Sequence, residues 1–521
     1  MNDWLSRNRD YTLTDPKTGF EISFAAMKFA EPELAALAPR FARASVEMAK
    51  IEAGEIKNPD EKRKVTHFTD RAGYAGSALF REVEEFAEAV RSGKIVGGTG
   101  KAFTAVAVNG IGGSALGPQL MQFAMNGPYW NELSTTARRG YLKIYFLDNT
   151  DASGFADLAQ VMDPETTLHL VISKSGGTRE TRNNMIAMEK FYAERKLDFS
   201  AFACAITMAG SELDKHAKGN NWLKVLPMAE SIGGRTSETS IVGHVPAALT
   251  GIDFSAFLSG ACAMDAWTRE REVKQNPALL LSAMWYIAGK GRGDRNMVIV
   301  PYSDRLVLLS RYLQQLVMES LGKELDLDGK VVHQGLSVFG NKGGTDAHAF
   351  IQQLNDGRDD FFVTFIEVLR DAARYDLGDG VTMGDYLHGF LEGLSAALRG
   401  KGRQLITIRV PRLDAFTLGQ LIALYERAVA MYAEYININA FHQPGVQAYK
   451  LAANGILQLS AQVKQRLAEL SPVSGTAAQL AEQLGLGEQA VEIGHLLDKA
   501  ALNGSGVSRT WDGSAWVYQV K

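Results

Sequence analysis

Residues 103–118 read FTAVAVNGIGGSALGP, an apolar run followed by glycines and then by a helix-like pattern. A strand, a glycine turn and a helix in this order are typical of one βαβ unit around a parallel sheet. The glycines allow a tight turn and bring backbone N–H groups to a helix N-terminus, where an anion is favoured. We therefore expect an α/β fold with a candidate anion loop behind its first strand.

The same alternation of strand-like and helix-like segments recurs along the chain in two series. Both series consist of short β-branched or aromatic runs that alternate with amphipathic segments, which indicates two doubly wound parallel sheets. The runs of the first series are 103–108, 142–147, 168–172, 202–207 and 223–226, and those of the second are 297–301, 361–368 and 405–410. Residues 31–53, 246–277 and 414–435 have helical patterns, the last of them long and amphipathic.

These patterns divide the chain into four expected parts. They are an N-terminal helical flank at 1–95, a first α/β domain at 96–260, a second at 261–465 and a small tail at 466–521. The tail has two short helical patterns and then an alternating hairpin with Asp512-Gly513 at its tip, an order like that of a winged helix. Residues 467–521 carry a net charge of −3, the wrong sign for binding a phosphate backbone, so packing or oligomerisation is favoured over DNA binding.

The composition excludes several classes of protein. The chain has 521 residues, 46% of them hydrophobic and 22% charged, which is typical of a folded chain of several domains. A net charge of −4 gives no overall attraction to nucleic acid or an anionic membrane. Cys204 and Cys262 lie in apolar sequence, which indicates a reducing compartment without a disulfide framework. The first ten residues contain no apolar signal segment, so we expect a cytoplasmic protein.

The glycine loop also matches the dinucleotide fingerprint G-x-G-x-x-G/A, which on its own is a weak signal. Nicotinamide-binding proteins carry an acidic residue about 20 positions later, whereas the next expected strand here ends only at Asp148. Nicotinamide binding and a plain tight turn therefore stay open beside anion binding at this loop.

A second candidate anion loop, SKSGGTRET at residues 173–181, follows the third expected strand. Its hydroxyls, its lysine and the N–H groups of an expected helix start suit a phosphate monoester dianion. The lysine precedes the glycines and the P-loop spacing is absent, which argues against ATP hydrolysis. A polar helix cap without a ligand is the alternative.

Arg235 and Glu319 are candidate catalytic residues. Arg235 lies in a third glycine loop, GGRTS at 233–237, on the carboxyl edge of the first expected sheet, where ligands of open α/β sheets bind. Glu319 ends an expected helix over 305–321 and shares a face with Gln315, so its carboxylate can serve as a proton acceptor. A surface arginine and a solvated glutamate are the ordinary alternatives.

His348 and Lys450 are further candidates. His348 follows a glycine-rich approach to a helix start, which suits an imidazole for proton exchange near neutral pH. Lys450 lies on the helix expected after Pro444, where an exposed lysine with its stem on apolar surface is the ordinary reading. None of the nine histidines has the spacing of metal ligands, so we expect no metal centre.

Five segments of the chain form an ordered set of motifs. They are G-I-G-G-S-x-L-G-P at 110–118, S-K-[ST]-x-x-T-x-E-T at 173–181, G-G-R-x-S at 233–237, M-E-S-x-G-K at 318–323 and F-x-Q-x-G-V-x-x-x-K at 441–450. In this order they resemble the glucose-6-phosphate isomerase family, over about residues 30–465. The resemblance implies that the two α/β domains are sugar isomerase domains with a sugar phosphate between them, and that no cofactor or metal is used.

The resemblance also implies roles for individual residues. Glu319 matches the base that moves a proton between C1 and C2, and Arg235 the group that stabilises the cis-enediolate. His348 matches a ring-opening histidine supplied by the neighbouring subunit of a homodimer, with Lys450 assisting at the ring oxygen. Glu180 matches a carboxylate near that histidine. The implied substrate and phosphate ligands are Gly112, Ser114, Ser173, Lys174, Ser175, Thr178, Gln315 and Gln443.

The sequence departs from the family pattern in two places. The usual F-D-Q-x-G-V-E is replaced by FHQPGVQ at 441–447, so that His442 and Gln447 stand where two carboxylates are usual near Lys450. The phosphate loop reads Ser-Gly-Gly-Thr at 175–178, which leans toward dual phosphoglucose/phosphomannose isomerases. That dual activity, a non-catalytic sugar-phosphate sensor and a nicotinamide oxidoreductase are the alternatives to a glucose-6-phosphate isomerase.

Overall fold

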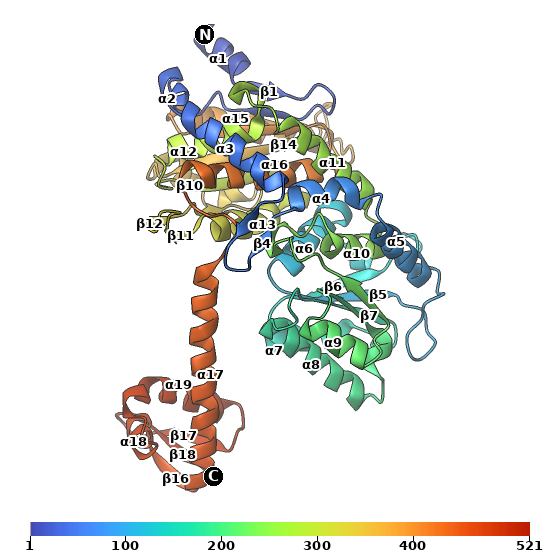
Figure 1. Cartoon of the computed structure of the whole chain (residues 1–521), viewed down its shortest axis with the longest axis vertical. Coiled ribbons are helices and arrows are strands. Elements are labelled where there is room, and N and C mark those ends of the chain that lie inside the picture. Colours follow the sequence, from blue (N-terminus) through green and yellow to red (C-terminus); the bar gives the residue numbers. More distant parts are fainter. Residues whose placement is uncertain (1) are drawn as a thin grey trace. The chain divides into compact units, whose positions relative to one another are not determined.

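The computed structural model describes residues 2–521, without the side chains of Asn2, Asp3 and Gln447. The described chain forms two compact units, one ending at His442 and the other running from Gln443 to Lys521. Two larger sheets, both with parallel strands at their centre, lie in the first unit with helices packed against them (Figure 1). The expected α/β class with two parallel sheets is confirmed.

The first sheet contains five parallel strands in the order β6-β5-β7-β8-β9. Their bounds are β5 Ala105–Asn109, β6 Lys143–Leu147, β7 Thr167–Ile172, β8 Ala203–Thr207 and β9 Lys224–Pro227, all within two residues of the expected runs. Every residue of β5, β7 and β8 is buried, which explains why these strands read as continuous apolar runs. Because the winding direction reverses between β5 and β7, the loops that follow these two strands flank the place where open α/β sheets bind ligands.

Helices cover both faces of this sheet. In Figure 1, α7, α8 and α9 lie on one side of it and α5, α6 and α10 on the other. Their bounds are α5 Ala78–Arg91, α6 Gly113–Asn126, α7 Ala152–Val161, α8 Arg179–Glu194, α9 Glu212–Gly219 and α10 Ile241–Thr250. The glycine loops therefore end where α6 and α8 begin, as the sequence predicted.

The second sheet is mixed, with the strand order β1-β2-β15-β14-β10-β13. The expected runs appear as β10 Asn296–Tyr302, β14 Phe361–Val368 and β15 Leu405–Val410, all parallel, with the short β13 Val338–Phe339 beside β10. The N-terminal flank adds two antiparallel strands at the edge, β1 Thr12–Thr14 and β2 Glu21–Ser23. The prediction of a purely helical flank was wrong here, because strands of three residues are too short to show alternation and form only by pairing with β15.

The remaining elements of the first unit are mostly helical. They are α1 Asn2–Asp10, α2 Glu31–Ala35, α3 Ala38–Glu52, α4 His67–Tyr74, α11 Phe254–Trp267, α12 Pro277–Ala288, α13 Leu309–Leu313, α14 Ile351–Asp356, α15 Met383–Gly400 and α16 Ala415–Tyr435, with the two-stranded ribbons β3 Ile56–Asn58 with β4 Arg63–Lys64, and β11 Lys323–Leu325 with β12 Val331–Gln334. Among the helices of residues 2–521, none is both long enough and apolar enough to cross a membrane.

Helix α16 forms the centre of the first unit and is buried on all sides except at Phe416. The expectation of an amphipathic helix at 414–435 therefore understates its burial. Two glycines allow it to cross α11 closely. A Cβ on Gly419 would lie only 2.0 Å from the carbonyl oxygen of Phe257, and a Cβ on Gly260 only 1.8 Å from the carbonyl oxygen of Phe416. Its polar residues consequently have to find partners inside the protein.

A buried cluster of charges joins α4, α11 and α16. Arg71 donates two hydrogen bonds of 2.6 Å to Asp265, one to each carboxylate oxygen, and a third of 2.5 Å to Glu426. Arg427 donates to the same Asp265 at 2.7 Å. The side chains of Arg71, Asp265, Glu426 and Arg427 are at most 3% exposed, so each charge depends on its partners rather than on water.

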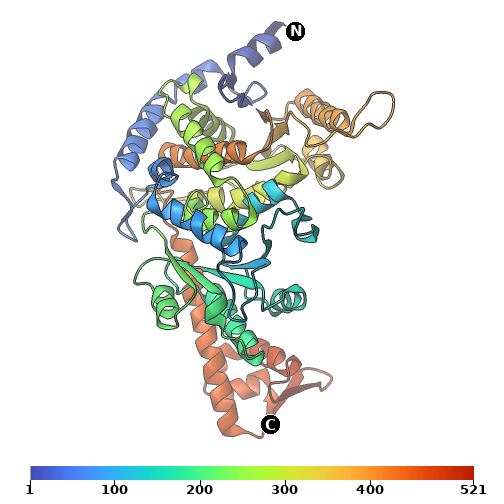
Figure 2. The same cartoon turned by 90° about the vertical axis from the view of Figure 1, so that its right-hand side faces the viewer.

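The second unit consists of a long helix and a small antiparallel sheet. Its elements are α17 Pro444–Leu470, β16 Val473–Thr476, α18 Ala477–Gln483, α19 Ala490–Leu502, β17 Val507–Trp511 and β18 Trp516–Val520. The strand order is β16-β18-β17, and Figure 2 shows α17 as one continuous helix leading to this sheet. Leu480, Leu497 and Tyr518 are the centre of its core. The expected helices and the hairpin with Asp512 at its tip are present, while the likeness to a winged helix stays a prediction.

Replacing Asp265 tests the importance of the buried charges. We expect Asp265→Asn to lower the free energy of unfolding by about 3–5 kcal/mol, because both arginines would lose the carboxylate they share and keep only Glu426 and Glu52, respectively, beside a buried charge. Urea denaturation measures the change. The matched control is Glu88→Gln, which breaks a surface pair with Arg91 and should leave stability nearly unchanged. Equal stability of the two variants would contradict the importance assigned to the cluster.

Candidate active site

The first glycine loop packs closely against the third one, and Ser237 Oγ donates a hydrogen bond to the carbonyl oxygen of Gly113 at 3.4 Å. Gly112 precedes α6 with a φ of 57°, a conformation that favours glycine. A Cβ on Gly113 would lie 1.7 Å from the carbonyl oxygen of Gly234, so the two loops can approach this closely only with glycine at 113. Ser114 lies in the first turn of α6, at the helix end that favours an anion.

The second glycine loop is shaped by its own hydroxyls. Ser173 Oγ accepts a hydrogen bond from Gly176 N at 3.1 Å and donates one to Thr178 Oγ1 at 3.3 Å. Ser175 Oγ accepts from Gly177 N at 3.2 Å. Gly176 has a φ of 76°, and a Cβ there would lie 2.2 Å from Leu213 N, so glycine at 176 has a structural cause.

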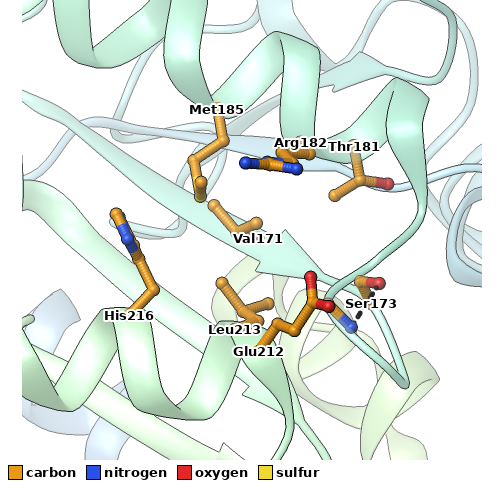
Figure 3. Close-up of a pocket in the computed structure, with 9 residues that line it drawn as sticks. Val171, Ser173, Thr181, Arg182, Met185, Glu212, Leu213 and His216 are labelled. Carbon is orange, nitrogen blue, oxygen red and sulfur yellow. Dashed lines mark hydrogen bonds between the residues drawn. The ribbon is translucent and has the colours of Figure 1, made fainter.

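A small cavity lies between this loop, α8 and α9. Figure 3 shows Ser173 at its border, Thr181 and Arg182 from α8, and His216 from α9. Its volume of about 130 Å³ is that of a few water molecules, too small for a hexose phosphate. The cavity is therefore a gap between α8 and α9 beneath the loop, and it is not a binding site for a sugar phosphate.

Lys174 connects the second loop to the segment that leads into the third. Its Nζ donates hydrogen bonds to the carbonyl oxygens of Glu230 at 2.5 Å and Ile232 at 3.2 Å. Burial, together with the nearby Arg63, lowers the pKa of Lys174 to about 8. Arg63 itself is buried and pairs with Glu61 at 2.5 Å. Sequence reasoning missed Arg63, since a two-residue strand in the flank gives no signal of its distant neighbours.

Arg235 lies in the short 3₁₀ turn Gly234–Thr236 and is 8% exposed. Its Nη1 donates to Glu319 Oε1 at 2.9 Å, and its Nη2 donates to the carbonyl oxygens of Ala440 at 2.6 Å and His442 at 3.4 Å. The guanidinium thus connects the third loop of the first sheet to the helix that follows β10 of the second. This pairing of Arg235 with Glu319 was not predicted from the sequence.

Glu319 is the last residue of a π-helical segment, Gln314–Glu319, that continues α13. The sequence predicted one regular helix over 305–321, whereas the structure has a short α-helix followed by a wider π-helical turn. π-Helical turns occur often at functional sites because they redirect side chains. Gln315 Nε2 lies 2.9 Å from the position of a Cβ on Gly112, so this segment approaches the first loop as well. The structure therefore brings Gly112, Arg235, Gln315 and Glu319 together.

Lys323 is a charged neighbour that sequence reasoning did not single out. Its Nζ donates to the carbonyl oxygens of Glu319 at 2.9 Å and Ser320 at 2.7 Å. Burial, reinforced by the positive charge of Arg235, lowers the pKa of Lys323 to about 7. The sequence could have singled out Lys323, because it is the last residue of the M-E-S-x-G-K motif.

The other candidates lie on other elements of the chain. His348 lies on the 3₁₀ turn Asp346–His348 and is exposed, and Glu180 is half-buried in the first turn of α8. Gln443 and Lys450 belong to the second unit, at the start of α17. Of the two unusual residues near Lys450, His442 has its Nδ1 2.9 Å from Asp60 Oδ2, and the side chain of Gln447 lies outside the described residues.

One group of possible metal ligands occurs among the described residues, away from the loops. Donor atoms of Glu367, His388 and Glu392 lie within 4.8 Å of one another. Arg409 donates to Glu367 at 2.8 Å and to Glu392 at 2.7 Å, and His388 Nδ1 lies 2.6 Å from Glu367 Oε1, so both carboxylates already have protein partners. The group is therefore an ion-pair cluster between β14, β15 and α15.

Comparisons with known proteins agree with this arrangement. The family model for phosphoglucose isomerase matches residues 41–401 and 397–473. The chain belongs to the phosphoglucose isomerase family. Two glucose-6-phosphate isomerases illustrate the similarity. That of Geobacter sulfurreducens is 47% identical over 95% of this chain and 94% of its own length, and that of Synechococcus elongatus is 46% identical over 97% and 96%.

A solved structure of the phosphoglucose isomerase family has the same fold. The crystal structure of a glucose-6-phosphate isomerase from Chlamydia trachomatis is 28% identical, with a TM-score of 0.77 over 88% of this chain and 91% of that one. The family resemblance drawn from the five motifs is confirmed.

A methyl group at Gly113 tests the contact between the first and third loops. We expect Gly113→Ala to lower the free energy of unfolding by about 1–3 kcal/mol, because the backbone at Gly234 has to move away. The control is Gly154→Ala inside α7, where an added Cβ meets nothing within 4 Å and stability should stay level or rise. Urea denaturation of both variants measures the difference, and a Gly113 variant as stable as the control would refute the contact.

Proposed function

We propose that this member of the phosphoglucose isomerase family interconverts glucose 6-phosphate and fructose 6-phosphate. The pairing of Arg235 with Glu319 beside two glycine loops at a sheet edge is the observation that carries the proposal. A base next to a fixed cation is what the reaction requires, because removing a proton beside a carbonyl group places negative charge on an oxygen. The relatives at 46–47% identity bear the name of this enzyme.

In the proposed reaction, Glu319 takes the proton from C2 of the open-chain aldose. The C–H electrons form the C1–C2 double bond, and the carbonyl oxygen becomes the enediolate oxygen near the Arg235 guanidinium. Glu319 then returns the proton to C1, while the hydroxyl proton on O2 moves to O1, which gives the ketose. A positioned base and a fixed cation each contribute about 10²- to 10⁴-fold in comparable sites.

The two glycine loops are the proposed phosphate site. The ligands would be Gly112, Ser114, Ser173, Lys174, Ser175 and Thr178, at the ends of α6 and α8 where the helix dipole favours an anion. Arg63, Lys174, Arg235 and Lys323 bring four basic side chains to this region, against the carboxylates of Glu61 and Glu319, in a chain of net charge −4. A dianion is thus attracted locally rather than by the whole molecule.

The remaining roles rest on the family motifs. We propose that His348 of a neighbouring subunit opens the sugar ring, assisted by Lys450, with Gln315 and Gln443 on the sugar and Glu180 near the histidine. The exposure of His348 is compatible with service to another subunit. The working species would be a cytoplasmic homodimer, with 96–260 and 261–465 as its sugar isomerase domains and the tail in packing or assembly.

The proposed base is tested by Glu319→Gln. The amide keeps the shape and the contact with Arg235 but accepts no proton, so kcat should fall by roughly 10³-fold or more while sugar-phosphate binding changes only a few-fold. A coupled assay and a binding titration give the two numbers. Undiminished turnover would refute the role of Glu319, and a wild-type protein that binds the sugar phosphate without turnover would identify a sensor instead.

Sharing of the active site between subunits is tested by complementation. The variants Glu319→Gln and His348→Ala, each inactive alone, should regain activity when mixed and reassembled, because one of the two sites of a hybrid dimer receives both intact residues. Subunit exchange is verified with differently tagged chains. Activity that stays at the level of the separate variants despite exchange would show that both residues act within one chain.

A further inference from the structure

Behind the Arg235–Glu319 pair lies a second, fully buried contact between the same two segments. Glu238 follows Arg235 by three residues, and Tyr312 precedes Glu319 by seven, on α13 two residues before the π-helical segment begins. Tyr312 Oη donates a hydrogen bond of 2.5 Å to Glu238 Oε1. The same hydroxyl lies 3.5 Å from the carbonyl oxygen of Arg235. This contact therefore sets how closely the segment bearing the arginine approaches the segment bearing the carboxylate.

Glu238 has no access to water, since its exposed fraction is 0%, and α6 closes over it. A Cβ on Gly117 of that helix would lie 2.6 Å from the Cβ of Glu238. A second carboxyl group, that of Glu426 on α16, also has an exposed fraction of only 2%. Two buried carboxylates side by side repel each other, so such a pair retains a proton.

The position of that proton follows from the partners of each carboxyl group. Glu426 accepts a hydrogen bond from Arg71, whose cation favours its ionised form, and Asp265 lies beyond Arg71. Glu238 faces Tyr312 and Glu426 without a basic partner. Burial and the charge of Glu426 raise the pKa of Glu238 well above its usual range. Among the described residues, Glu238 Oε2 and Glu426 Oε1 are buried without a hydrogen-bond partner, and a proton on Glu238 shared with Glu426 would satisfy both oxygens.

We propose that Glu238 is a positioning residue that shares a proton with Glu426, accepts from Tyr312, and thereby holds the Arg235 loop against the helix of Glu319. The role rests on the proposed isomerase function and deepens it. Removing the polar group would leave the Tyr312 hydroxyl without its carboxylate acceptor and Glu426 with Arg71 as its remaining partner, and it would loosen the two segments that carry the reacting groups. A displacement of about 1 Å at reacting groups is enough to cost about 10²-fold in rate.

Two substitutions of Glu238 separate positioning from general stability. Glu238→Leu removes both hydrogen bonds, and we expect kcat to fall about 10- to 100-fold with a smaller change in the KM for glucose 6-phosphate. Glu238→Gln keeps an oxygen for Tyr312 and gains an N–H for Glu426, so it should restore kcat close to wild type. Tyr312→Phe should resemble the leucine variant, and the double variant should be no worse than either single one.

The control is Glu434→Leu, a glutamate on α16 that is 8% exposed and pairs with Arg43 away from the site. It should lower stability without lowering kcat. A folded Glu238→Leu variant with the kcat of wild type would overturn the positioning role. A glutamine variant as impaired as the leucine variant would overturn the shared proton.

Proton counting provides a readout that needs no turnover. Glu238 is neutral in the folded protein and ionised in the unfolded chain between pH 6 and 8, so its unfolding releases about one proton and its contribution to stability decreases as the pH rises. The pH dependence of the free energy of unfolding in urea gives the number of protons released on unfolding. Glu238→Gln should release about one proton per molecule fewer than wild type. An unchanged count would overturn the shared proton alone, whereas a wild type without isomerase activity would overturn the proposed function and the positioning role with it.

Discussion

The ion pair between Arg235 and Glu319 is the constraint on which the arrangement of the site depends. Arg235 lies in a loop at the first sheet and Glu319 on the helix that follows β10 of the second, so the pair forms only if that loop reaches that helix. Gly113 allows that loop to lie against the first one, and the π-helical turn places Glu319 and Gln315 toward the same loops. One 2.9 Å contact thus requires correct packing of two sheets and three loops.

The polar interior behind this pair extends across the first unit. From Glu238 the contacts pass through Glu426 to Arg71 and on to Asp265, joining α16, α4 and α11. Buried ion pairs of this kind add little net stability compared with apolar packing. Removing one partner nevertheless destabilises the protein strongly, because the other charge then stays buried without compensation. Helices α11 and α16, which carry these charges, also form the hydrophobic core. The position of Arg235 relative to Glu319 is therefore coupled to the packing of α16.

The sequence predicted the repeated elements well. Runs such as those that became β5, β7 and β14 are mostly apolar because these strands are buried on both faces, and the glycine loops after β5 and β7 show where the helices begin. It failed for β1 and β2, which are only three residues long and exist because β15 offers an edge. It also failed for the full burial of α16, since a pattern of polar residues looks amphipathic whether its partners are water or Arg71.

For the candidate site, the residue types of the loops and the order of the five motifs were sufficient to indicate the family, because glycines, hydroxyls and a lysine at strand ends have few other uses. The sequence by itself indicated which segments are candidate anion loops and which carboxylate and arginine are candidates. Only the tertiary structure decided that Arg235 meets Glu319, that Arg63 and Lys323 lie near these loops, and that burial beside Glu426 raises the pKa of Glu238. These properties depend on distances between groups separated by many residues and on exclusion of water, and neither is encoded in any local pattern.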